Sequence, residues 1–491
     1  MVKTSPVPPG RIRVINDVPV RPTGDFVLYW MTAIRRSQWN FCLQRAVELA
    51  EECEKPLLVF EALRSGYSWA SDRLHHFVIQ GMADNQRRLK KHGIAYFPYL
   101  ESEPGDGTGL LKYLAERACA VVGDDFPCFF LPAMTRVAAN QIGGRFELVD
   151  SNGILPLRAA DQVFVRAHYF RRFLQKNLRP HLRQFPQRNP LAGKKLPQLN
   201  QLPPLIGKRW PVADVARRAV EPASLADFPI DHCVTPGSVA GGSEAAQARL
   251  RRFLKQSVDE YEEERNHPDS DGGSGLSPYL HFGHISPHQI FHELMKRDEW
   301  SIEDLAEKAN GSREGWWNAS PATEAFLDEL ITWREVGYNM CWQRRDYDRY
   351  ESLPDWAQTT LRDHERDPRE YLYELEDFEH SRTHDELWNA AQRQLVCEGR
   401  MHNYLRMLWG KKILHWTPDA RTALQIMIEL NNKYALDGRN PNSYSGIFWV
   451  LGRYDRAWGP ERKIFGKIRY MASENTAKKL RLKQYLARYG D

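Results

Sequence analysis

The chain has 491 residues, of which 42% are hydrophobic and 27% are charged, and its formal net charge at pH 7 is +5. This composition is typical of a soluble globular protein, and the length exceeds what one hydrophobic core supports, so we expect two or three domains. No apolar run approaches the roughly 20 residues of a membrane span, and no hydrophobic signal segment follows the N-terminus. We therefore expect a cytoplasmic protein that makes no contact with a membrane.

Cysteine usage and charge distribution narrow the possibilities further. The seven cysteines are widely spaced and include no CxxC pair, which argues against a disulfide scaffold and against a metal site. Residues 450–491 contain eleven Lys and Arg against four Asp and Glu, a net charge of +7 that leaves about −2 for residues 1–449. A solvated basic tail would have this charge as well, but the interleaved aromatic residues favour a packed surface that binds a polyanion.

The N-terminal third of the chain alternates between strand-like and helix-like segments. Residues 1–24 contain five prolines and are interpreted as an extended arm. Beyond the arm, apolar runs predict strands at 25–30, 56–60, 94–97, 120–123 and 145–149, and amphipathic patterns predict helices at 40–54, 71–92, 109–117 and 133–142. This alternation predicts a Rossmann-like parallel sheet with helices on both faces, in a domain at 25–175. A GxGxxG fingerprint is absent, so ligand binding by this domain stays open.

A proline-rich region separates this domain from the rest of the chain. Prolines recur through residues 176–242, which we interpret as an interdomain linker. From 243 to 491 the pattern is helical and predicts an all-α domain that begins with a helix at 244–265. A later glycine- and serine-rich stretch predicts a turn into a helix near Pro278, with Ser277 as its N-cap. The free N–H groups of such a helix start suit a phosphate, although most glycine-serine turns are only loops.

One helix near the C-terminus combines side chains that soluble helices rarely bury together. Asn403, Arg406 and Met407 have i, i+3 and i+4 spacing and share one face. Trp409 and Trp416 are two turns apart and share another face. The first face could line a pocket, although a buried helix with a structural ion pair would show the same pattern.

Seven motifs follow one another in the C-terminal half: SGLSPYLHFGHIS (274–286), ELITWRE (329–335), LPDWAQTTL (353–361), THDELWNAAQ (383–392), MHNYLRMLWGKKILHWT (401–417), LDGRNPN (436–442) and FGKIRYM (465–471). Their sequences and order resemble those of the class II cyclobutane pyrimidine dimer DNA photolyases, within the photolyase/cryptochrome superfamily. The likeness extends more loosely to LYWM (28–31) and PLLVFEAL (56–63). It implies an N-terminal α/β antenna domain and a helical FAD-binding catalytic domain at 243–491.

The resemblance implies FAD that is reduced and anionic in the active form. By match to the family, the FAD-binding residues would be Tyr261, Ser274, Gly275, Leu276, Ser277, Asn403, Arg406, Asn431, Asp437 and Arg439. Asn431 would face the flavin N5. Arg406, paired with Asp437, would stabilise the anion without leaving a bare buried charge. An antenna chromophore, either a deazaflavin or a folate, is compatible with the N-terminal domain, and the sequence leaves its presence and identity open.

The same resemblance implies a pocket for damaged DNA. Its residues would be Glu329, Trp333, Tyr404, Met407 and Trp449, of which Glu329 and Trp333 are expected on one helix face because of their i, i+4 spacing. Aromatic rings can stack on a pyrimidine dimer, and a carboxyl group can bond to it as negative charge develops. Each of these residues alone would also be explained by core packing or by a solvated surface.

Two further sets of residues follow from the family match. Trp388, Trp409 and Trp416 match a chain of tryptophans that carries electrons from the surface to oxidised flavin, although core packing would use the same residues. Arg456 and Arg469 would contact DNA near the nucleotide that photolyases extrude from the duplex. The basic residues around them would bind phosphates without regard to sequence.

The function implied is light-driven repair, in which excited reduced FAD donates an electron to a cyclobutane pyrimidine dimer in UV-damaged DNA. The enzyme would be a monomeric carbon–carbon lyase, associated with the nucleoid if the source is bacterial or archaeal. The alternative is a cryptochrome-like photoreceptor without repair activity, against which the lesion-pocket residues argue. Repair of (6-4) photoproducts would call for histidines in the pocket.

Overall fold

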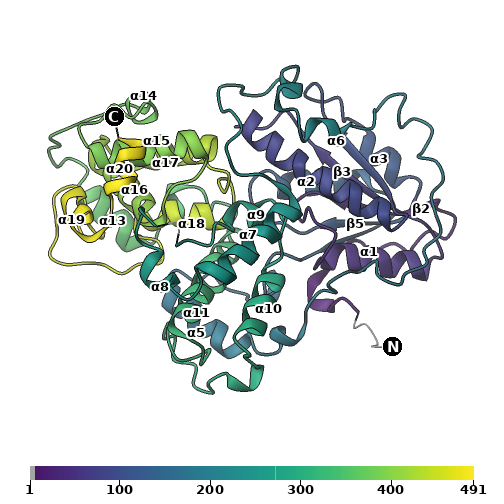
Figure 1. The fold of residues 1–491 in the computed structure, drawn as a ribbon, viewed down its shortest axis with the longest axis horizontal. Coiled ribbons are helices and arrows are strands. Elements are labelled where there is room, and N and C mark those ends of the chain that lie inside the picture. The colour runs from purple at the N-terminus through teal and green to yellow at the C-terminus, as the bar shows by residue number, and fades with distance from the viewer. Residues whose placement is uncertain (1–5, 271, 491) are drawn as a thin grey trace. The chain divides into compact units, whose positions relative to one another are not determined.

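The computed structural model of the chain describes residues 6–270 and 272–490. The chain divides into two compact units (Figure 1). Unit 1 contains Met1–Ala159, Pro180–Leu250 and Leu276–Glu293, and unit 2 contains Ala160–Arg179, Arg251–Gly275 and Leu294–Asp491. Each unit therefore draws on more than one stretch of the sequence, whereas the sequence-based boundaries assume one continuous stretch for each domain.

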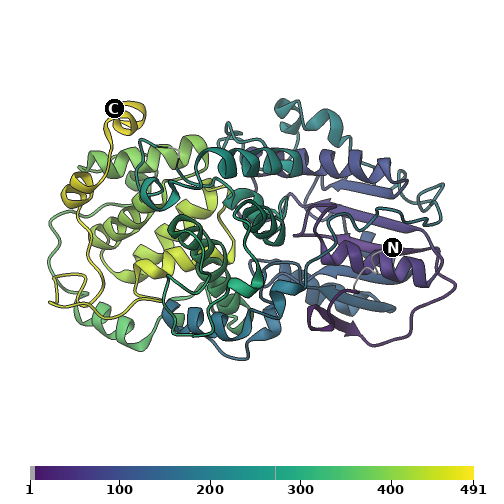
Figure 2. The same cartoon turned by 60° about the horizontal axis from the view of Figure 1, so that its bottom comes forward.

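Unit 1 is built on a six-stranded sheet with the strand order β1-β6-β5-β2-β3-β4, whose strands lie side by side in Figure 2. The strands are β1 (Ile12–Asn16), β2 (Phe26–Met31), β3 (Leu57–Leu63), β4 (Ala95–Leu100), β5 (Ala118–Asp124) and β6 (Arg145–Val149). Strands β2 to β6 pair in parallel, as the alternation of strands and helices predicts. The outer strand β1 pairs antiparallel with β6.

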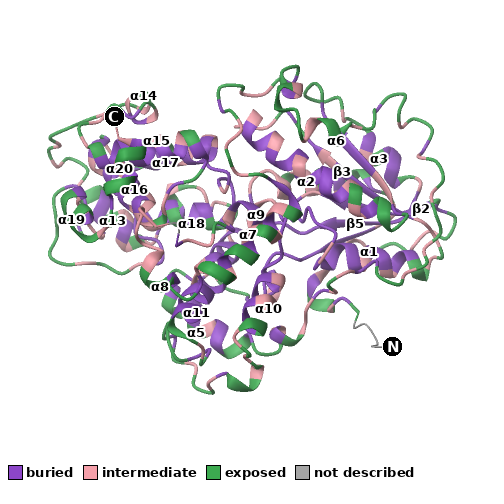
Figure 3. Ribbon diagram, viewed as in Figure 1, coloured by how far each residue is buried: buried purple, intermediate pink, exposed green. Residues whose placement is uncertain are grey.

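Successive side chains of the central strands enter two different cores, which explains why the strands are buried throughout (Figure 3). From β2, alternate residues beginning at Val27 pack against α1 (Phe41–Glu52) on one face. The intervening residues, beginning at Phe26, pack with α3 (Leu110–Ala115) and α4 (Leu131–Gln141) on the other face. The predicted doubly covered Rossmann-like sheet is confirmed.

The predicted arm at 1–24 is wrong in one respect, because it contains β1. This five-residue edge strand was missed because its sequence, IRVIN, shows no regular alternation of apolar and polar residues. The preceding residue, Arg11, is fully buried, and its guanidinium donates to the carbonyl oxygens of Gly153 at 3.1 Å and Ile154 at 2.6 Å. These bonds fasten the arm to the chain that follows β6.

Most of the proline-rich region belongs to unit 1 and packs within it. Trp210 is 1% exposed, its indole N–H donates to the Asp106 carbonyl at 3.0 Å, and its ring contacts Tyr113 at 5.6 Å. The short helix α6 (Val215–Arg218) packs against α2 (Asp72–Lys91). Much of the predicted linker therefore contributes to the structure of unit 1, since buried aromatic residues within it supply contacts.

Apart from α5, which begins before the proline-rich region, the remaining helices begin at its end or later, and most belong to unit 2. They are α5 (Ala167–Asn177), α7 (Gly242–Gln256), α8 (Tyr261–Glu264), α9 (Ser277–His281), α10 (Pro287–Arg297), α11 (Pro321–Leu327), α12 (Arg334–Gln343), α13 (Asp355–Asp363), α14 (Leu375–Glu379), α15 (Glu386–Glu398), α16 (Asn403–Trp416), α17 (Ala420–Tyr434), α18 (Pro441–Val450), α19 (Ser473–Lys479) and α20 (Lys483–Tyr489). The predicted helix at 244–265 is two helices, α7 and α8. Among the described residues, none of the helices combines the length and apolar character that crossing a bilayer requires.

Candidate active site

Helix α16 is held at its middle by neighbouring helices of unit 2. It packs against α15, α17 and α18. Gly410 allows the close approach: a Cβ at this position would lie 2.5 Å from Val450 Cγ2 and 3.1 Å from Met427 Sδ. The side chains that α16 presents on either side of Gly410 therefore have fixed positions relative to α17 and α18.

The predicted ion pair between Arg406 and Asp437 is present. The Arg406 guanidinium forms two bonds with the Asp437 carboxylate, at 3.1 and 3.4 Å. Asn431, near the end of α17, is buried, and its amide donates to Ser443 Oγ at 2.6 Å. Asn403 lies one turn before Arg406 and is exposed. The structure thus contains a guanidinium whose charge is neutralised by a carboxylate, together with a buried amide. These groups are expected of a site for an anionic ring.

Arg439 supports the loop that carries Asp437. Its backbone has a φ of +61°, and its buried guanidinium donates to the carbonyl oxygens of Asn432 and, at 3.2 Å, Ala435. Its backbone N–H donates to Asn432 Oδ1 at 2.9 Å. These bonds tie the loop to the C-terminal end of α17 and so fix the position of Asp437.

A cavity of about 430 Å³ opens beside α16, within unit 2. From the helices it is lined by Tyr404, Met407 and Trp449, three of the five residues predicted to hold the lesion. The remaining lining comes from the basic segment 458–479, including Trp458 and Arg469. Its volume falls within the range of about 300–1,000 Å³ that is usual for ligand sites. Aromatic faces and positive charge therefore meet in one cavity, as stacked bases next to phosphates require.

Arg469 is fixed in the wall of this cavity. It forms an ion pair with Asp455 at 3.0 Å, and its guanidinium lies 4.0 Å from the ring centroid of Trp458. Arg456 is exposed and lies 4.5 Å from the Trp458 ring. Burial acts to raise the pKa of Asp455, but the hydrogen bonds from Arg469 and the Arg456 N–H hold it below its usual range. The carboxylate therefore stays ionised and keeps Arg469 in place.

The other two predicted lesion residues lie outside the lining of this cavity. Glu329 and Trp333 belong to a π-helical turn, Asp328–Trp333, where the sequence pattern predicts an α-helix. The Glu329 carboxylate accepts from Arg265 Nη1 at 2.7 Å, and its side chain is 33% exposed. Burial raises its pKa, although Arg265 acts to lower it, and the neighbouring Asp328 adds to the increase. The widened π turn changes the i, i+4 alignment, a deviation common at functional sites.

Tyr261 and the glycine-serine turn form a second part of the predicted cofactor set. The Tyr261 ring is buried and lies 5.4 Å from the Arg265 guanidinium, which pairs with Glu329. In the turn, Gly275 has a φ of +63°, which favours glycine. The predicted N-cap role of Ser277 is wrong: Leu276 precedes the helix, and Ser277 is its first residue. Pro278 occupies the second helical position, where the N–H that proline lacks would have no partner within the helix.

The three predicted electron-transfer tryptophans are all buried. Trp388 and Trp416 make an edge contact with ring centroids 6.0 Å apart. The Trp388 indole N–H donates to the Trp409 carbonyl at 3.0 Å, and the Trp409 indole N–H donates to Gln392 Oε1 at 2.9 Å. Direct ring contact between Trp409 and Trp416, which their spacing allows, is not found among the described residues. Trp388 is therefore the residue that links the other two.

None of these tryptophans reaches the surface directly. Trp416 contacts Tyr373, with ring centroids 5.8 Å apart, and the Tyr373 hydroxyl lies 2.8 Å from His384 Nδ1. Tyr371, which is 39% exposed, stacks on His384 at 3.7 Å. A continuous series of aromatic contacts therefore connects the buried tryptophans with solvent.

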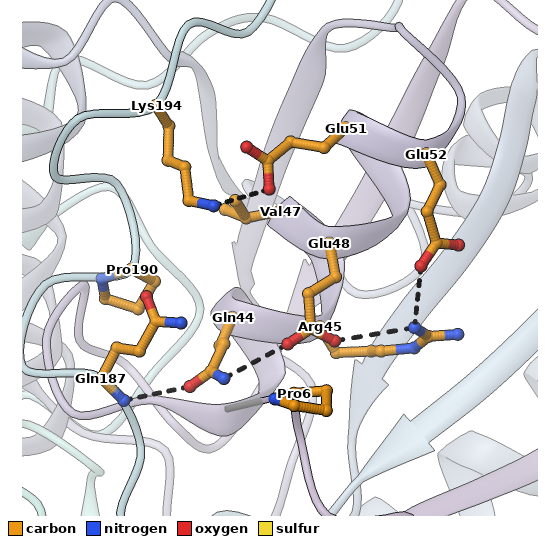
Figure 4. A pocket seen from close by; sticks show the side chains of 10 residues that line it. All are labelled: Pro6, Gln44, Arg45, Val47, Glu48, Glu51, Glu52, Gln187, Pro190 and Lys194. Atoms are coloured by element: carbon orange, nitrogen blue, oxygen red, sulfur yellow. Dashed lines mark hydrogen bonds and ion pairs between the residues drawn. The ribbon is translucent and has the colours of Figure 1, made fainter. Parts of the chain in front are cut away.

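Unit 1 contains a smaller hollow, between α1 and the segment 187–194 (Figure 4). Its volume is about 180 Å³. The charged side chains that face it pair with one another, Arg45 with Glu48 and Glu52, and Lys194 with Glu51. The hollow is smaller than ordinary ligand sites, and its three carboxylates outnumber its two cationic side chains. It does not suit a deazaflavin or a folate.

The donors of unit 2 fit a flavin such as the FAD that the sequence implies. Arg406 and Asp437 supply a fixed positive charge with its counter-charge, and Asn431 supplies a neutral amide. Arg334 on α12 is buried, and its Nη2 donates to Tyr338 Oη at 3.0 Å. Its Nη1 is also buried and has no hydrogen-bond partner among the described residues. An unsatisfied buried N–H is costly, so this donor is one that a bound ligand would satisfy.

Curated proteins named deoxyribodipyrimidine photo-lyase match almost the whole chain. The protein of Methanothermobacter thermautotrophicus is 35% identical over 478 residues, which cover 97% of each chain. The protein of Arabidopsis thaliana is 32% identical and covers 99% of this chain and 94% of its own length, and that of Potorous tridactylus is 31% identical and covers 94% and 81%. A scan against protein-family models finds no match.

A solved photolyase structure has the same fold as this chain. A bacterial class III photolyase from Agrobacterium tumefaciens superposes with a TM-score of 0.67 at 17% identity, over 96% of this chain and 87% of its own. This chain therefore shares with that photolyase a fold in which a Rossmann-like sheet is combined with helices. The chain belongs to the deoxyribodipyrimidine photo-lyase family, as its near-full-length relatives at 31–35% identity establish. It is therefore a lyase for which FAD is the expected cofactor.

Several residues of the site were missed by sequence reasoning. Trp458 and Lys479 line the cavity, and Arg265 pairs with Glu329. The first two lie in the basic, aromatic stretch that the charge distribution singled out, so this signal could have found them. Nothing in the sequence pointed to Arg265, because its ion pair with Glu329 depends on how α8 packs near the π-helical turn.

Proposed function

We propose that this lyase uses light to split cyclobutane pyrimidine dimers in DNA, and that it is of the class II type. The observation that carries the proposal is the cavity lined by Tyr404, Met407 and Trp449 beside the basic segment 458–479. Such a cavity has the size, the stacking faces and the positive rim that an extruded dinucleotide requires. A photoreceptor without repair activity has no need of such a pocket.

The residues that would hold FAD are those assigned from the family match. The Arg406–Asp437 pair would lie beside the flavin ring and Asn431 near its N5, with Asn403 and Arg439 in the same region. The turn 274–277 would hold the diphosphate, and Tyr261 would lie nearby. When bound in its reduced form, FAD would supply the light-excited electron that opens the dimer.

The protein's own task at the ring is electrostatic. Arg406 would favour the anionic form of the ring, and because Asp437 balances the guanidinium, the site avoids the cost of an isolated buried charge. Asn431 is neutral and donates to Ser443 Oγ, so it offers no ready acid to the ring. The site therefore holds the cofactor in its anionic state.

In the lesion pocket, Trp449 would stack on the dimer and Met407 would form an apolar wall, with Tyr404 and Trp333 beside it. Glu329 has a raised pKa and an Arg265 partner. A protonated carboxyl group can donate a hydrogen bond to a dimer carbonyl as negative charge develops there. The part played by Glu329 is therefore to stabilise that charge.

DNA binding is assigned to the basic segment. Arg469 and Arg456 would contact DNA next to the extruded dimer, and Arg462 and Lys479 add positive charge at the cavity. Affinity for undamaged DNA should fall as salt increases, because each phosphate contact releases counterions. Action on DNA as a monomer, at a cytoplasmic or nucleoid-associated location, is part of the proposal.

The proposal also includes the reduction of oxidised flavin and the capture of light by a second chromophore. Trp388, Trp409 and Trp416 would carry electrons towards oxidised flavin. Unit 1 would serve as the antenna domain, with a deazaflavin or a folate as its chromophore. The absorption spectrum of the purified protein, after release of its cofactors, tests whether a second chromophore is bound.

The decisive experiment measures dimer loss. Purified protein with reduced flavin is mixed with an oligonucleotide that contains one thymine dimer, and intact thymines are quantified after blue light and after darkness. We expect repair only in light. Equal conversion in darkness, or light-dependent binding without conversion, would overturn the proposal, and the second result would favour the photoreceptor alternative.

A further inference from the structure

Lys411 is a buried lysine without a carboxylate partner. It lies on α16 and is 1% exposed. Its Nζ donates to the Val450 carbonyl at 2.6 Å, and no described carboxylate lies within ion-pair distance of it. Lysine is almost never buried this deeply without a counter-charge. Burial of Lys411 is expected to destabilise the fold, so its presence in the core suggests a role in function.

The ammonium group of Lys411 lies behind one wall of the cavity. Its Nζ is 4.9 Å from the ring centroid of Trp449. Trp449 lines the cavity and Lys411 does not, so the indole separates the charge from the space where a ligand would bind. Arg469 lies 5.5 Å from the same ring and does line the cavity. The Trp449 indole thus contacts two cations, one of them entirely enclosed by protein.

We propose that Lys411 is a positioning residue for lesion recognition: its ammonium group holds the Trp449 indole in the orientation that stacks on the extruded pyrimidine dimer. A cation–π contact is strengthened when the cation is desolvated, as it is here. The hydrogen bond to Val450, which follows Trp449 directly on α18, fixes the lysine to the same helix that carries the ring. This inference rests on the proposed function.

The neighbouring residue Lys412 provides a matched contrast. It is also buried, and its Nζ lies 5.1 Å from the Trp416 ring. Unlike Lys411, it has a carboxylate partner, Asp385, at 3.5 Å. Lys412 therefore has the features of a structural lysine, and replacing it serves as a control for the loss of a buried lysine from α16.

The charge of Lys411 is poised to change near neutral pH. Burial lowers its pKa to about 7, Asp455 acts to raise it and Arg469 acts to lower it. Asp455 and Arg469 are the charged residues that shift the pKa of Lys411, and no charged group on the helices packed against α16 has a comparable effect. Asp455 itself remains ionised, since Arg469 lowers its pKa. Recognition that depends on the cation should therefore weaken as pH rises through about 7.

The test measures binding in darkness with the purified full-length holoprotein. Fluorescence anisotropy gives Kd for an oligonucleotide with one thymine dimer and for the same oligonucleotide without it, and the ratio defines lesion discrimination. For Lys411→Met we expect discrimination to fall about tenfold near pH 6.5, with unchanged Kd for undamaged DNA. Lys411→Arg should restore at least half of it, and Lys412→Met should retain it.

The dependence of lesion discrimination on pH distinguishes a role of the charge from a merely structural role of the side chain. Between about pH 6 and about pH 8.5, discrimination by the wild type should decline, whereas Lys411→Arg should stay high and Lys411→Met low throughout. If Lys411→Met fails to fold, the profiles of the wild type and Lys411→Arg decide. Equal discrimination by wild type and Lys411→Met, or identical pH profiles of wild type and Lys411→Arg, would overturn the proposal. A wild type that does not distinguish dimer-containing DNA would instead refute the proposed function.

Discussion

The two sides of helix α16 handle buried charge in opposite ways. On the side of the tryptophans, Lys412 lies over Trp416 and is neutralised by Asp385. On the side of the cavity, Lys411 lies behind Trp449 and has no carboxylate within ion-pair distance among the described residues. Both lysines are buried and adjacent in sequence, so the difference lies in what the surrounding helices supply.

This contrast separates structure from function within one helix. A buried ion pair whose partners are both provided by the protein is complete before any ligand binds. A buried cation beside a cavity leaves an unbalanced positive potential, which suits a polyanionic ligand such as DNA. Changes on the tryptophan side should therefore affect stability and electron supply, and changes on the cavity side should affect recognition.

The largest expected effect is on the tryptophan side. Trp409→Phe removes an indole whose N–H donates to Gln392 and replaces it with a ring that is harder to oxidise. Reduction of oxidised flavin by light, followed by its absorbance, should collapse, while repair by chemically pre-reduced protein should persist. Trp316→Phe, at a buried position elsewhere in unit 2, is the control and should keep both activities. Unchanged photoreduction in Trp409→Phe would show that the electron route is wrong.

The next effect is on stability. Lys412→Met leaves the Asp385 carboxylate, whose side chain is 9% exposed, without its cation. Breaking one partner of a buried pair costs about 3–5 kcal/mol, and the bonds that Asp385 keeps with Trp388 N and Ser473 place the expected value at the lower end. Urea unfolding measures it. The double variant with Asp385→Asn should recover part of the loss, and additive effects of the two substitutions would contradict the pair.

A cavity-side substitution should have a smaller effect, confined to recognition. Trp449→Ala removes the stacking face, and loss of one stacked base contact is worth about 1–3 kcal/mol. Dark binding of dimer-containing DNA should weaken by the corresponding factor, roughly five- to 150-fold, while undamaged DNA should bind as before. Arg456→Ala is the complementary variant and should weaken both DNAs alike. Equal weakening of both DNAs by Trp449→Ala would place this ring outside the lesion pocket.

The fold of unit 1 was largely predictable, and the geometry of unit 2 only partly. Strands buried on both faces read as continuous apolar runs, so β2 and β5 were evident from sequence. The edge strand β1 was missed because its apolar residues Ile12, Val14 and Ile15 do not alternate regularly with polar ones and none of its residues is fully buried. Helical periodicity in the sequence predicted the helices of unit 2. The π-helical turn at Asp328–Trp333 has no local sequence signature, because it depends on packing.

The site residues divide in a similar way. Arg406 and Asp437 were expected to pair, and the structure brings them within hydrogen-bonding distance. Lys411 was passed over because lysine on a helix is usually solvated, and only tertiary packing encloses it. The tryptophan contacts also needed the structure, since the helical spacing favours Trp409 with Trp416, whereas the contact observed is between Trp388 and Trp416.

The smallest expected effect concerns the pH dependence of stability, and it follows from the charge that α16 leaves unbalanced. Burial lowers the pKa of Lys411 to about 7 from the ordinary value near 10.5 that it regains on unfolding. Between these values the unfolded chain binds more protons than the folded one, so Lys411 makes stability rise with pH across this window, by at most about 1.4 kcal/mol per pH unit. Below pH 7 the full cost of the buried cation is present. The difference between the wild-type and Lys411→Met unfolding free energies, measured at several pH values by urea denaturation, isolates this slope from other titrating groups. The wild type should gain stability relative to Lys411→Met as pH rises, and a constant difference would mean that Lys411 keeps its ordinary pKa in the folded protein.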